Sequence, residues 1–267
     1  MPFTLAHPAA VIPIRKYGVF SALVLGSMMP DTLYFIPRIE AHDTYGHTLP
    51  GLFLYCLPAG IALLWLFHAF LKKPLMSLFP EDQQRKLQAA SPEFRFFPLR
   101  RFAMIVLSLL IGAASHVTWD AFTHSNQWGA QLVPVLRRVV RVPPHSYFVI
   151  SDLLQLGSSV VGLVVLYVYY RRWLRTAEQR EVEAHLPLAV RAVLLVAFAA
   201  GTVAPTIARV ALNPMFWNFK RVLLGYAAMV GIKVMCVEVL AFCVVWHLIF
   251  RANGGDGQSS MRYSSEA

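Results

Sequence analysis

Apolar residues are grouped into blocks about as long as a membrane-spanning helix, with short polar stretches between them. An α-helix rises about 1.5 Å per residue, so roughly 20 apolar residues cross the hydrocarbon core of a bilayer. The pattern therefore predicts an all-α fold, a polytopic transmembrane helical bundle. Its five expected full spans are 49–71, 102–119, 147–170, 188–212 and 223–250.

The first apolar segment, 17–36, differs from these blocks because Gly26, Pro30 and Asp31 interrupt it near its middle. A cleavable signal peptide has a basic region, an unbroken apolar run and a small-residue cleavage site. Here Pro30-Asp31 falls where such a run should end, so we expect the segment to be retained. It is compatible with a full crossing and with a re-entrant path.

No internal repeat is visible, and we treat residues 1–250 as a single helical membrane domain. Its motif-bearing part is 1–170, and its C-terminal spans occupy 188–250. The Gly/Ser-rich remainder, 251–267, is expected to be a disordered tail. In the polar stretch after the first full span, the sequence PEDQQRK at 80–86 predicts a short surface helix.

Composition agrees with a membrane protein, since 57% of the residues are hydrophobic and only 14% are charged. A soluble domain has about 25% charged residues. The net charge of +10 is concentrated in polar stretches, with seven cations at 72–101 and four at 171–187. Under the positive-inside rule these two stretches lie in the cytoplasm of a bacterial inner-membrane protein. The opposite ends of the spans, which carry His47, Asp120 and His124, then face the periplasm.

The charge pattern also excludes nucleic acid as a partner, because the cations form no basic groove and are not interleaved with aromatic residues. Membrane lipid is the expected partner, through its anionic headgroups. The three cysteines lie inside apolar blocks. An odd number without metal-type spacing argues against a disulfide framework or a cysteine zinc site. The oligomeric state stays open.

Ionisable residues at membrane depth are costly and therefore point to function. His116 and Asp120 form a His-x-x-x-Asp pair at the end of a span. This spacing puts both side chains on one helix face, where a nitrogen and a carboxylate can hold one cation. A buried histidine–aspartate hydrogen bond is the alternative. His124 continues the face, but eight helical residues cover about 12 Å, so it would serve a second metal, a substrate phosphate or the helix end.

Three earlier residues complete the set of candidates. Asp31 is either the N-cap of the following helix or a carboxylate ligand at a Pro-induced break. His47 precedes a span, with His42 as a nearby rival. If 17–36 were one straight helix, His7 could lie more than about 30 Å from Asp31, so a shared site requires the N-terminal segment to fold back. A mixed histidine and carboxylate set favours zinc, or manganese, over calcium.

Five motifs together resemble the bacterial membrane family catalogued as domain of unknown function 4184. They are MPFTLAHPAA, GSMMPD, GHTLPGLFLY, SHVTWDAFTH and QLGSSVVGL, and they cover most of the chain from Met1 to about Tyr170. The family pattern has a histidine where this chain has Leu156. The resemblance implies an architecture and candidate residues rather than a reaction.

The order of the histidines and aspartates is also similar, more distantly, to the ligand order of zinc-dependent phospholipase C and the single-strand-specific zinc nucleases. It resembles that of membrane-bound metal-dependent hydrolases as well. By this likeness one divalent metal is held by four residues, Asp31, His47, His116 and Asp120. Asp120 would bridge to a second metal near His7, and His124 would belong to another ligand set.

The leading hypothesis is a metal-dependent hydrolase that acts on a phosphoester or lipid-like substrate at the outer leaflet. A bound metal would lower the pKa of its water and polarise the phosphoryl oxygen. Asp120 and His124 are the expected catalytic residues. The expected metal ligands are His7, Asp31, His47, His116 and Asp120.

The alternative hypothesis is a non-catalytic membrane protein, a transporter or a scaffold. In that case the same histidines and aspartates form a buried hydrogen-bond network. Asp152, Lys233 and Glu238 lie within spans and motivate this alternative, because ionisable groups inside a membrane also mark ion pathways and helix-pairing sites.

Overall fold

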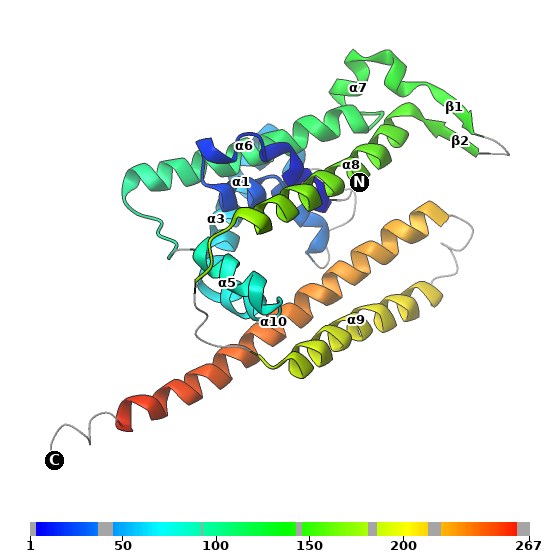
Figure 1. The fold of residues 1–267 in the computed structure, drawn as a ribbon. Coiled ribbons are helices and arrows are strands. Elements are labelled where there is room, and N and C mark those ends of the chain that lie inside the picture. Colours follow the sequence, from blue (N-terminus) through cyan, green and yellow to red (C-terminus); the bar gives the residue numbers. More distant parts are fainter. Residues whose placement is uncertain are drawn as a thin grey trace. The chain divides into compact units, whose positions relative to one another are not determined.

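The structure is a computed structural model that describes residues 4–36, 45–91, 93–142, 146–180, 186–212 and 220–260. Helices dominate these residues, and one two-stranded hairpin is present (Figure 1). The chain divides into two compact units. Unit 1 comprises Met1–Trp65 and Glu93–Ala177, and unit 2 comprises Leu66–Pro92 and Glu178–Ala267. Every candidate metal ligand and catalytic residue belongs to unit 1.

Five helical segments are long and apolar enough to cross a membrane, which confirms the predicted number of spans. They are Leu49–Ser77, Leu99–Thr123, Ile150–Thr176, Leu188–Ala211 and Tyr226–Ile249. The chain is therefore a multi-pass, all-helical membrane protein. The short helix expected at 80–86 is also present, as α5 (Glu81–Ala89).

The first span is a continuous helical run in which two π-helical segments interrupt the α-helix. It comprises α2 (Leu49–Gly51), the π-helical η5 (Leu52–Cys56), α3 (Leu57–Leu66), the π-helical η6 (Phe67–Leu71) and α4 (Lys72–Ser77). Pro58 lies two residues after η5 and has no N–H to donate, and its ring conflicts with a regular turn before it. The wider winding of η5 therefore occupies the turn that precedes this proline.

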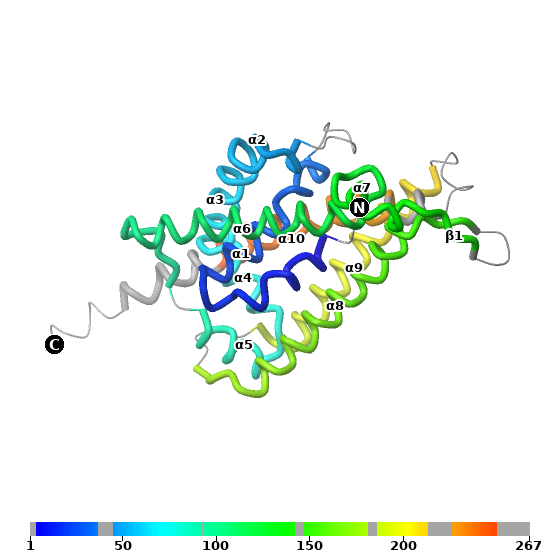
Figure 2. Tube along the Cα trace, turned by 90° about the horizontal axis from the view of Figure 1, so that it is seen from above, coloured from blue at the N-terminus to red at the C-terminus, as the bar shows by residue number. Residues whose placement is uncertain are grey.

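The N-terminal segment is broken into short helices and does not form a straight span. These are the 3-10 helices η1 (Thr4–Val11) and η2 (Arg15–Tyr17), then α1 (Phe20–Gly26) and the 3-10 helix η3 (Met29–Phe35). With seven residues, α1 is about 10 Å long, a third of the hydrocarbon core. The chain folds back, so that η1 lies against α6 (Leu99–Thr123) and α8 (Ile150–Thr176), as Figure 2 shows.

The core of unit 1 lies where α1, α3 and α6 meet. One cluster consists of Ala22, Leu64, Ile105 and Leu109. A second cluster, of Met29, Cys56 and Ala113, continues it toward η3. This apolar packing holds η3 against the second half of α6, which brings Asp31 close to the histidine and aspartate of that helix.

The segment between α6 and α8 is more ordered than the predicted loop. It contains α7 (Trp128–Leu132), the 3-10 helix η7 (Pro134–Arg137) and an antiparallel hairpin of β1 (Val139–Val142) and β2 (Ser146–Val149). Hydropathy predicted that the third span starts at Tyr147, but α8 begins only at Ile150. The reason is local: the β-branched and aromatic residues of β1 and β2 favour strands, although they also raise the hydropathy of the region.

Unit 2 contains α4, α5, α9 (Leu188–Ala211) and α10 (Lys220–Ser260). Arg191 of α9 is buried and donates to the Phe79 carbonyl over 2.6 Å. The Thr202 hydroxyl donates to the Glu238 carboxylate over 2.7 Å, which joins α9 to α10. Helix α10 extends into the segment expected to be a tail, and 261–267 lie outside the described residues.

Candidate metal centre

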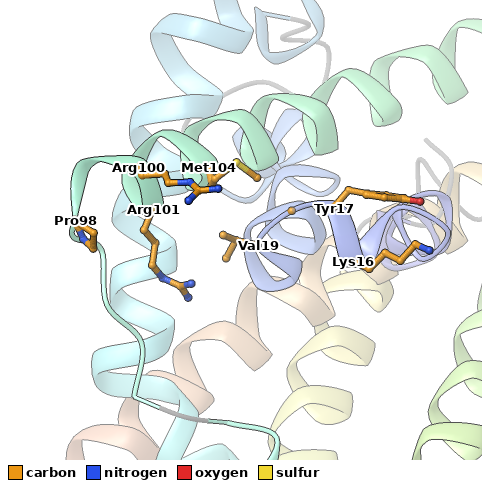
Figure 3. A pocket seen from close by; sticks show the side chains of 8 residues that line it. Lys16, Tyr17, Val19, Pro98, Arg100, Arg101 and Met104 are labelled. Atoms are coloured by element: carbon orange, nitrogen blue, oxygen red, sulfur yellow. The ribbon is translucent and has the colours of Figure 1, made fainter.

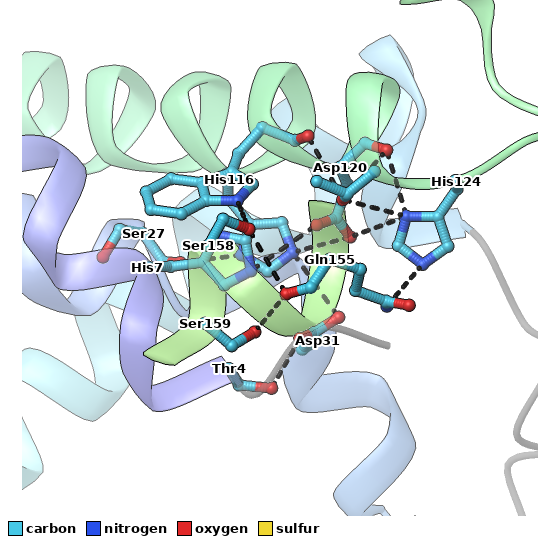
Figure 4. Close-up of polar contacts among 12 residues, drawn as sticks. Thr4, His7, Ser27, Asp31, His116, Asp120, His124, Gln155, Ser158 and Ser159 are labelled. Atoms are coloured by element: carbon cyan, nitrogen blue, oxygen red, sulfur yellow. Dashed lines mark hydrogen bonds and ion pairs between the residues drawn. The ribbon is translucent and has the colours of Figure 1, made fainter. Parts of the chain in front are cut away.

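Four side chains converge where η3, η4 (Tyr45–His47) and the end of α6 meet (Figure 4). Each offers one ligand atom, and all four atoms lie within 4.8 Å of one another. Three of the residues are buried, and the fourth is partly exposed. This buried group could hold a metal ion. Its members are Asp31, His47, His116 and Asp120.

The four distances between a histidine nitrogen and an aspartate oxygen in this group are alike. Asp31 Oδ1 lies 3.5 Å from both His47 Nε2 and His116 Nε2. Asp120 Oδ2 lies 3.4 Å from His47 Nε2 and 3.5 Å from His116 Nε2. Ligands placed tetrahedrally at 2.0–2.2 Å from a zinc ion are about 3.3–3.6 Å apart. The four histidine–aspartate separations fall within that range, and all pairs of ligand atoms, including aspartate with aspartate and histidine with histidine, lie within 4.8 Å.

The same distances are long for direct ion-pair hydrogen bonds. An N–H group that donates to a carboxylate with charge on either partner is usually about 2.7–2.9 Å from it. His116 Nε2 and Asp120 Oδ1 are buried and make no hydrogen bond among the described residues. The group therefore resembles a ligand shell more than a closed hydrogen-bond network.

The His116 ring is oriented by its other nitrogen. Nδ1 lies 2.8 Å from the Ser27 carbonyl oxygen, which can only accept, so Nδ1 carries a proton and Nε2 is the nitrogen that faces the two aspartates. A backbone carbonyl in this role is common behind metal-bound histidines. Gly112, one turn before His116, makes the contact feasible, because a Cβ there would lie 2.4 Å from the Leu23 oxygen and 2.7 Å from the Ser27 nitrogen.

Asp31 and His47 are positioned by a second close backbone contact. A Cβ on Gly46 would lie 2.5 Å from the Pro30 oxygen, so only glycine allows η4 to pack this tightly on η3. The Thr4 hydroxyl donates to Asp31 Oδ2 over 2.5 Å, which leaves Oδ1 directed at the two histidines. Asp31 lies inside η3, whose N-cap is Met28, so it does not act as the helix cap, and it is buried within the group that could hold a metal ion.

His7 lies beside the four-residue group but is not one of its members. Its ring stacks on the His116 ring with centroids 3.8 Å apart, and its Nε2 is 3.5 Å from Asp120 Oδ1. Both ring nitrogens are buried without a hydrogen-bond partner among the described residues. Burial and the nearby His116 lower the pKa of His7 to about 3, so the ring is neutral and able to accept a cation.

His124 occupies a different position from the one an uninterrupted helix would give it. Helix α6 ends at Thr123, and His124 has an extended backbone. Its Nδ1 donates to the Asp120 carbonyl over 3.0 Å and lies 4.0 Å from Asp120 Oδ2. Its Nε2 is 3.3 Å from the Gln155 amide nitrogen, which can only donate. His124 therefore borders the group without facing its centre. His42 lies outside the described residues.

Electrostatics in the group favour charged carboxylates. Burial would raise the pKa of Asp31, but the interactions with the neighbouring His116 and His47 rings outweigh it and lower the pKa well below the ordinary value. For His47, burial lowers the pKa, and the interactions with Asp120 and Asp31 raise it by more, so the net direction is upward. An ion bound here would take the place of the protons that now compensate the carboxylates.

Several supporting residues were not predicted as part of the site. Thr4 lies in the motif MPFTLAHPAA and Ser27 in GSMMPD, but their roles could not be predicted, since they act through contacts that only folding creates. Gln155 lies in the QLGSS motif, which did mark the region. Leu156, which replaces the histidine of the family pattern, is 64% exposed, so its side chain points away from the group. The departure at this position therefore removes no ligand.

A separate cavity of about 340 Å³ lies at the other end of α6 (Figure 3). Lys16, Arg100 and Arg101 line it together with the start of α6. It is about 30 Å along the helix from Asp120. Its lining has cations but no histidine or carboxylate, so it offers no metal site.

The family model described as "Domain of unknown function (DUF4184)" matches residues 1–244. Because the match covers most of the chain, the protein belongs to this family, as the motifs predicted. No curated protein and no solved structure matches the chain. The protein is thus a multi-pass membrane protein of the DUF4184 family with a buried histidine and aspartate group.

Proposed function

We propose that the protein is a membrane-embedded, metal-dependent hydrolase of phosphoester or lipid-like substrates. The observation that carries the proposal is the set of near-equal 3.4–3.5 Å separations among two carboxylate oxygens and two imidazole nitrogens. Histidine and carboxylate ligands are typical of hydrolytic metal sites, and beside four protein ligands a water would take a fifth position. Zinc suits this donor set best, and manganese is the alternative.

A divalent metal in this position would lower the pKa of a bound water and polarise a phosphoryl oxygen. Hydrolysis adds water across a P–O ester bond: the water oxygen bonds to phosphorus, the ester P–O bond breaks, and the leaving oxygen takes a proton. The side chains of Asp31, His47, His116 and Asp120 would hold this metal and so position it against the substrate.

His124 is the proposed proton acceptor and donor. It borders Asp120, its Nδ1 is held by the Asp120 carbonyl, and its side chain is 27% exposed, so a substrate can reach it. His7 and Asp120 Oδ1 face each other at 3.5 Å and both lack hydrogen-bond partners among the described residues. This pair is the proposed place for a second metal, bridged by Asp120.

The location of the reaction follows from the charge distribution. The two most basic polar stretches are proposed to lie in the cytoplasm of an inner membrane. The end of α6 that carries Asp120 then lies at the periplasmic surface. The non-catalytic alternative is less well supported, since the histidine and aspartate group does not close into direct hydrogen bonds of ordinary length.

Metal analysis of the purified protein tests the proposal. We expect stoichiometric zinc or manganese in the wild type and its loss in Asp120→Asn, a variant of nearly the same shape. Asp152→Asn is the matched control, because Asp152 is a carboxylate of a neighbouring span outside the group, and it should keep the metal. His124→Ala should also keep the metal but lose turnover of bis(p-nitrophenyl) phosphate. Absence of stoichiometric metal in the wild type would sink the idea.

A further inference from the structure

An apolar groove of about 450 Å³ lies beside the metal centre, between α6 and α8. This volume is within the usual range for small-molecule sites, about 300–1,000 Å³. Its walls come from the second half of α6 and the first half of α8, and include Phe122 and Leu154. No charged side chain lines it.

Three of the four hydroxyl groups in the groove donate to carbonyl groups of their own helices. Ser115 donates to the Gly112 carbonyl over 2.7 Å, and Ser158 donates to the Gln155 carbonyl over 3.2 Å. Thr123 makes a similar contact with the Trp119 carbonyl at 3.3 Å. These groups are satisfied internally, so the surface that the groove presents is almost entirely apolar.

The groove and the metal centre share a wall. Trp119 lines the groove, its indole N–H donates to Ser158 over 3.1 Å, and its ring meets the His7 ring at a centroid distance of 5.3 Å. Thr123, at the other end of the lining, lies 3.5 Å from the Asp120 carbonyl oxygen. A molecule in the groove would therefore reach the surroundings of Asp120.

Depth in the membrane argues for the identity of this molecule. Asp120 lies three residues before the end of α6, about 4.5 Å from the boundary of the span. Phosphate groups of lipids lie at this boundary. The groove extends from Phe122 inward to Ser115, about 10 Å deeper, into the region that acyl chains fill. Both helices that form it are membrane spans, so the bilayer itself supplies the occupant.

We propose that the groove between α6 and α8 holds an acyl chain of a phospholipid whose phosphoester lies at the metal centre. The substrate is then a membrane phospholipid that enters from the bilayer, rather than a water-soluble phosphoester. This inference rests on the proposed function for the reaction, but lipid binding in the groove can be measured without turnover.

Photocrosslinking tests the groove directly. The probe is a phosphatidylglycerol with a diazirine in its acyl chain, in vesicles of phosphatidylethanolamine and phosphatidylglycerol that contain the full-length protein. We expect crosslinks concentrated on the peptides around Phe122 and Leu154. Thr118→Trp, at an exposed position of the lining, should reduce them. Ala114→Trp is the matched control, because Ala114 is exposed on the same helix outside the groove. Labelling spread evenly over all exposed spans would overturn the inference.

Turnover separates this inference from the function on which it rests. With metal-loaded protein, Thr118→Trp should lower kcat/KM for vesicle phospholipid about tenfold or more and lower that for bis(p-nitrophenyl) phosphate by a much smaller factor. An equal effect on both substrates, or none on either, refutes the lipid assignment. If neither substrate is hydrolysed while the crosslinks stay in the groove, the hydrolase proposal fails and the lipid site stands.

Discussion

Replacing Gly112 by alanine should disturb the metal centre without changing any of its ligands. A Cβ at this position would lie 2.4 Å from the Leu23 oxygen, 2.7 Å from the Ser27 nitrogen and 2.9 Å from the Gly26 carbonyl carbon. All three atoms belong to the backbone of the α1 segment, so no side chain can rotate to make room. The α1 segment must move away from α6.

The size of the effect follows from these distances. Ordinary van der Waals contact begins at 3.4 Å, so the α1 backbone must shift by about 1 Å. The Ser27 carbonyl would then leave His116 Nδ1, now 2.8 Å away. Overpacking of this kind costs about 1–3 kcal/mol, and loss of a supporting contact behind a metal-bound histidine weakens metal binding about 10–100-fold.

Thermal unfolding in detergent and zinc titration against a chelating dye measure the two effects. Gly157→Ala is the matched control, since nothing lies within 4 Å of a Cβ at that position of α8. Alanine there should be neutral, or stabilising by up to about 1 kcal/mol. If Gly112→Ala keeps both its unfolding temperature and its zinc affinity, the reasoning from close helix contact to ligand orientation is refuted.

Two further predictions concern pH and the second unit. The pKa of His47 is raised above its ordinary value of 6.5, so in the metal-free protein its protonated form stabilises the fold below that value, and this contribution is lost as pH rises through the raised pKa. A metal needs the neutral ring, so the increase in unfolding temperature on adding zinc should grow with pH, and a pH-independent increase would contradict the assignment of His47 as a ligand. In unit 2, Glu238→Gln should weaken the α9–α10 contact through Thr202 and lower thermal stability, while metal content stays at the wild-type level; loss of the metal would contradict the assignment of all metal ligands to unit 1.

The spans could be predicted because they depend on a property that each residue contributes by itself. A helix of about twenty apolar residues crosses the hydrocarbon core regardless of its tertiary contacts, so the five spans can be predicted from hydropathy alone. The β1–β2 hairpin was not readable in this way. Valine and aromatic residues suit both a strand and a membrane helix, and pairing between Val140 and Phe148 decides between them.

The candidate site was readable only in part. The spacing of His116 and Asp120 places both on one face of a helix, and that relation holds in any fold that keeps the helix. Asp31 and His47 reach the same point only because the N-terminal segment folds back and Gly46 lets two backbones approach. The position of His124 depended on where α6 ends, which helical periodicity does not indicate.

The sequence by itself thus determined that this protein lies in a membrane, the number of its spans and the residue types able to bind a metal. These properties follow from local composition and spacing. Only the tertiary structure decided which candidates converge, which nitrogen of His116 is free and where the apolar groove lies. Those properties depend on contacts between residues far apart in the chain, such as Ser27 with His116 at 2.8 Å, and side-chain packing sets them to within fractions of an ångström.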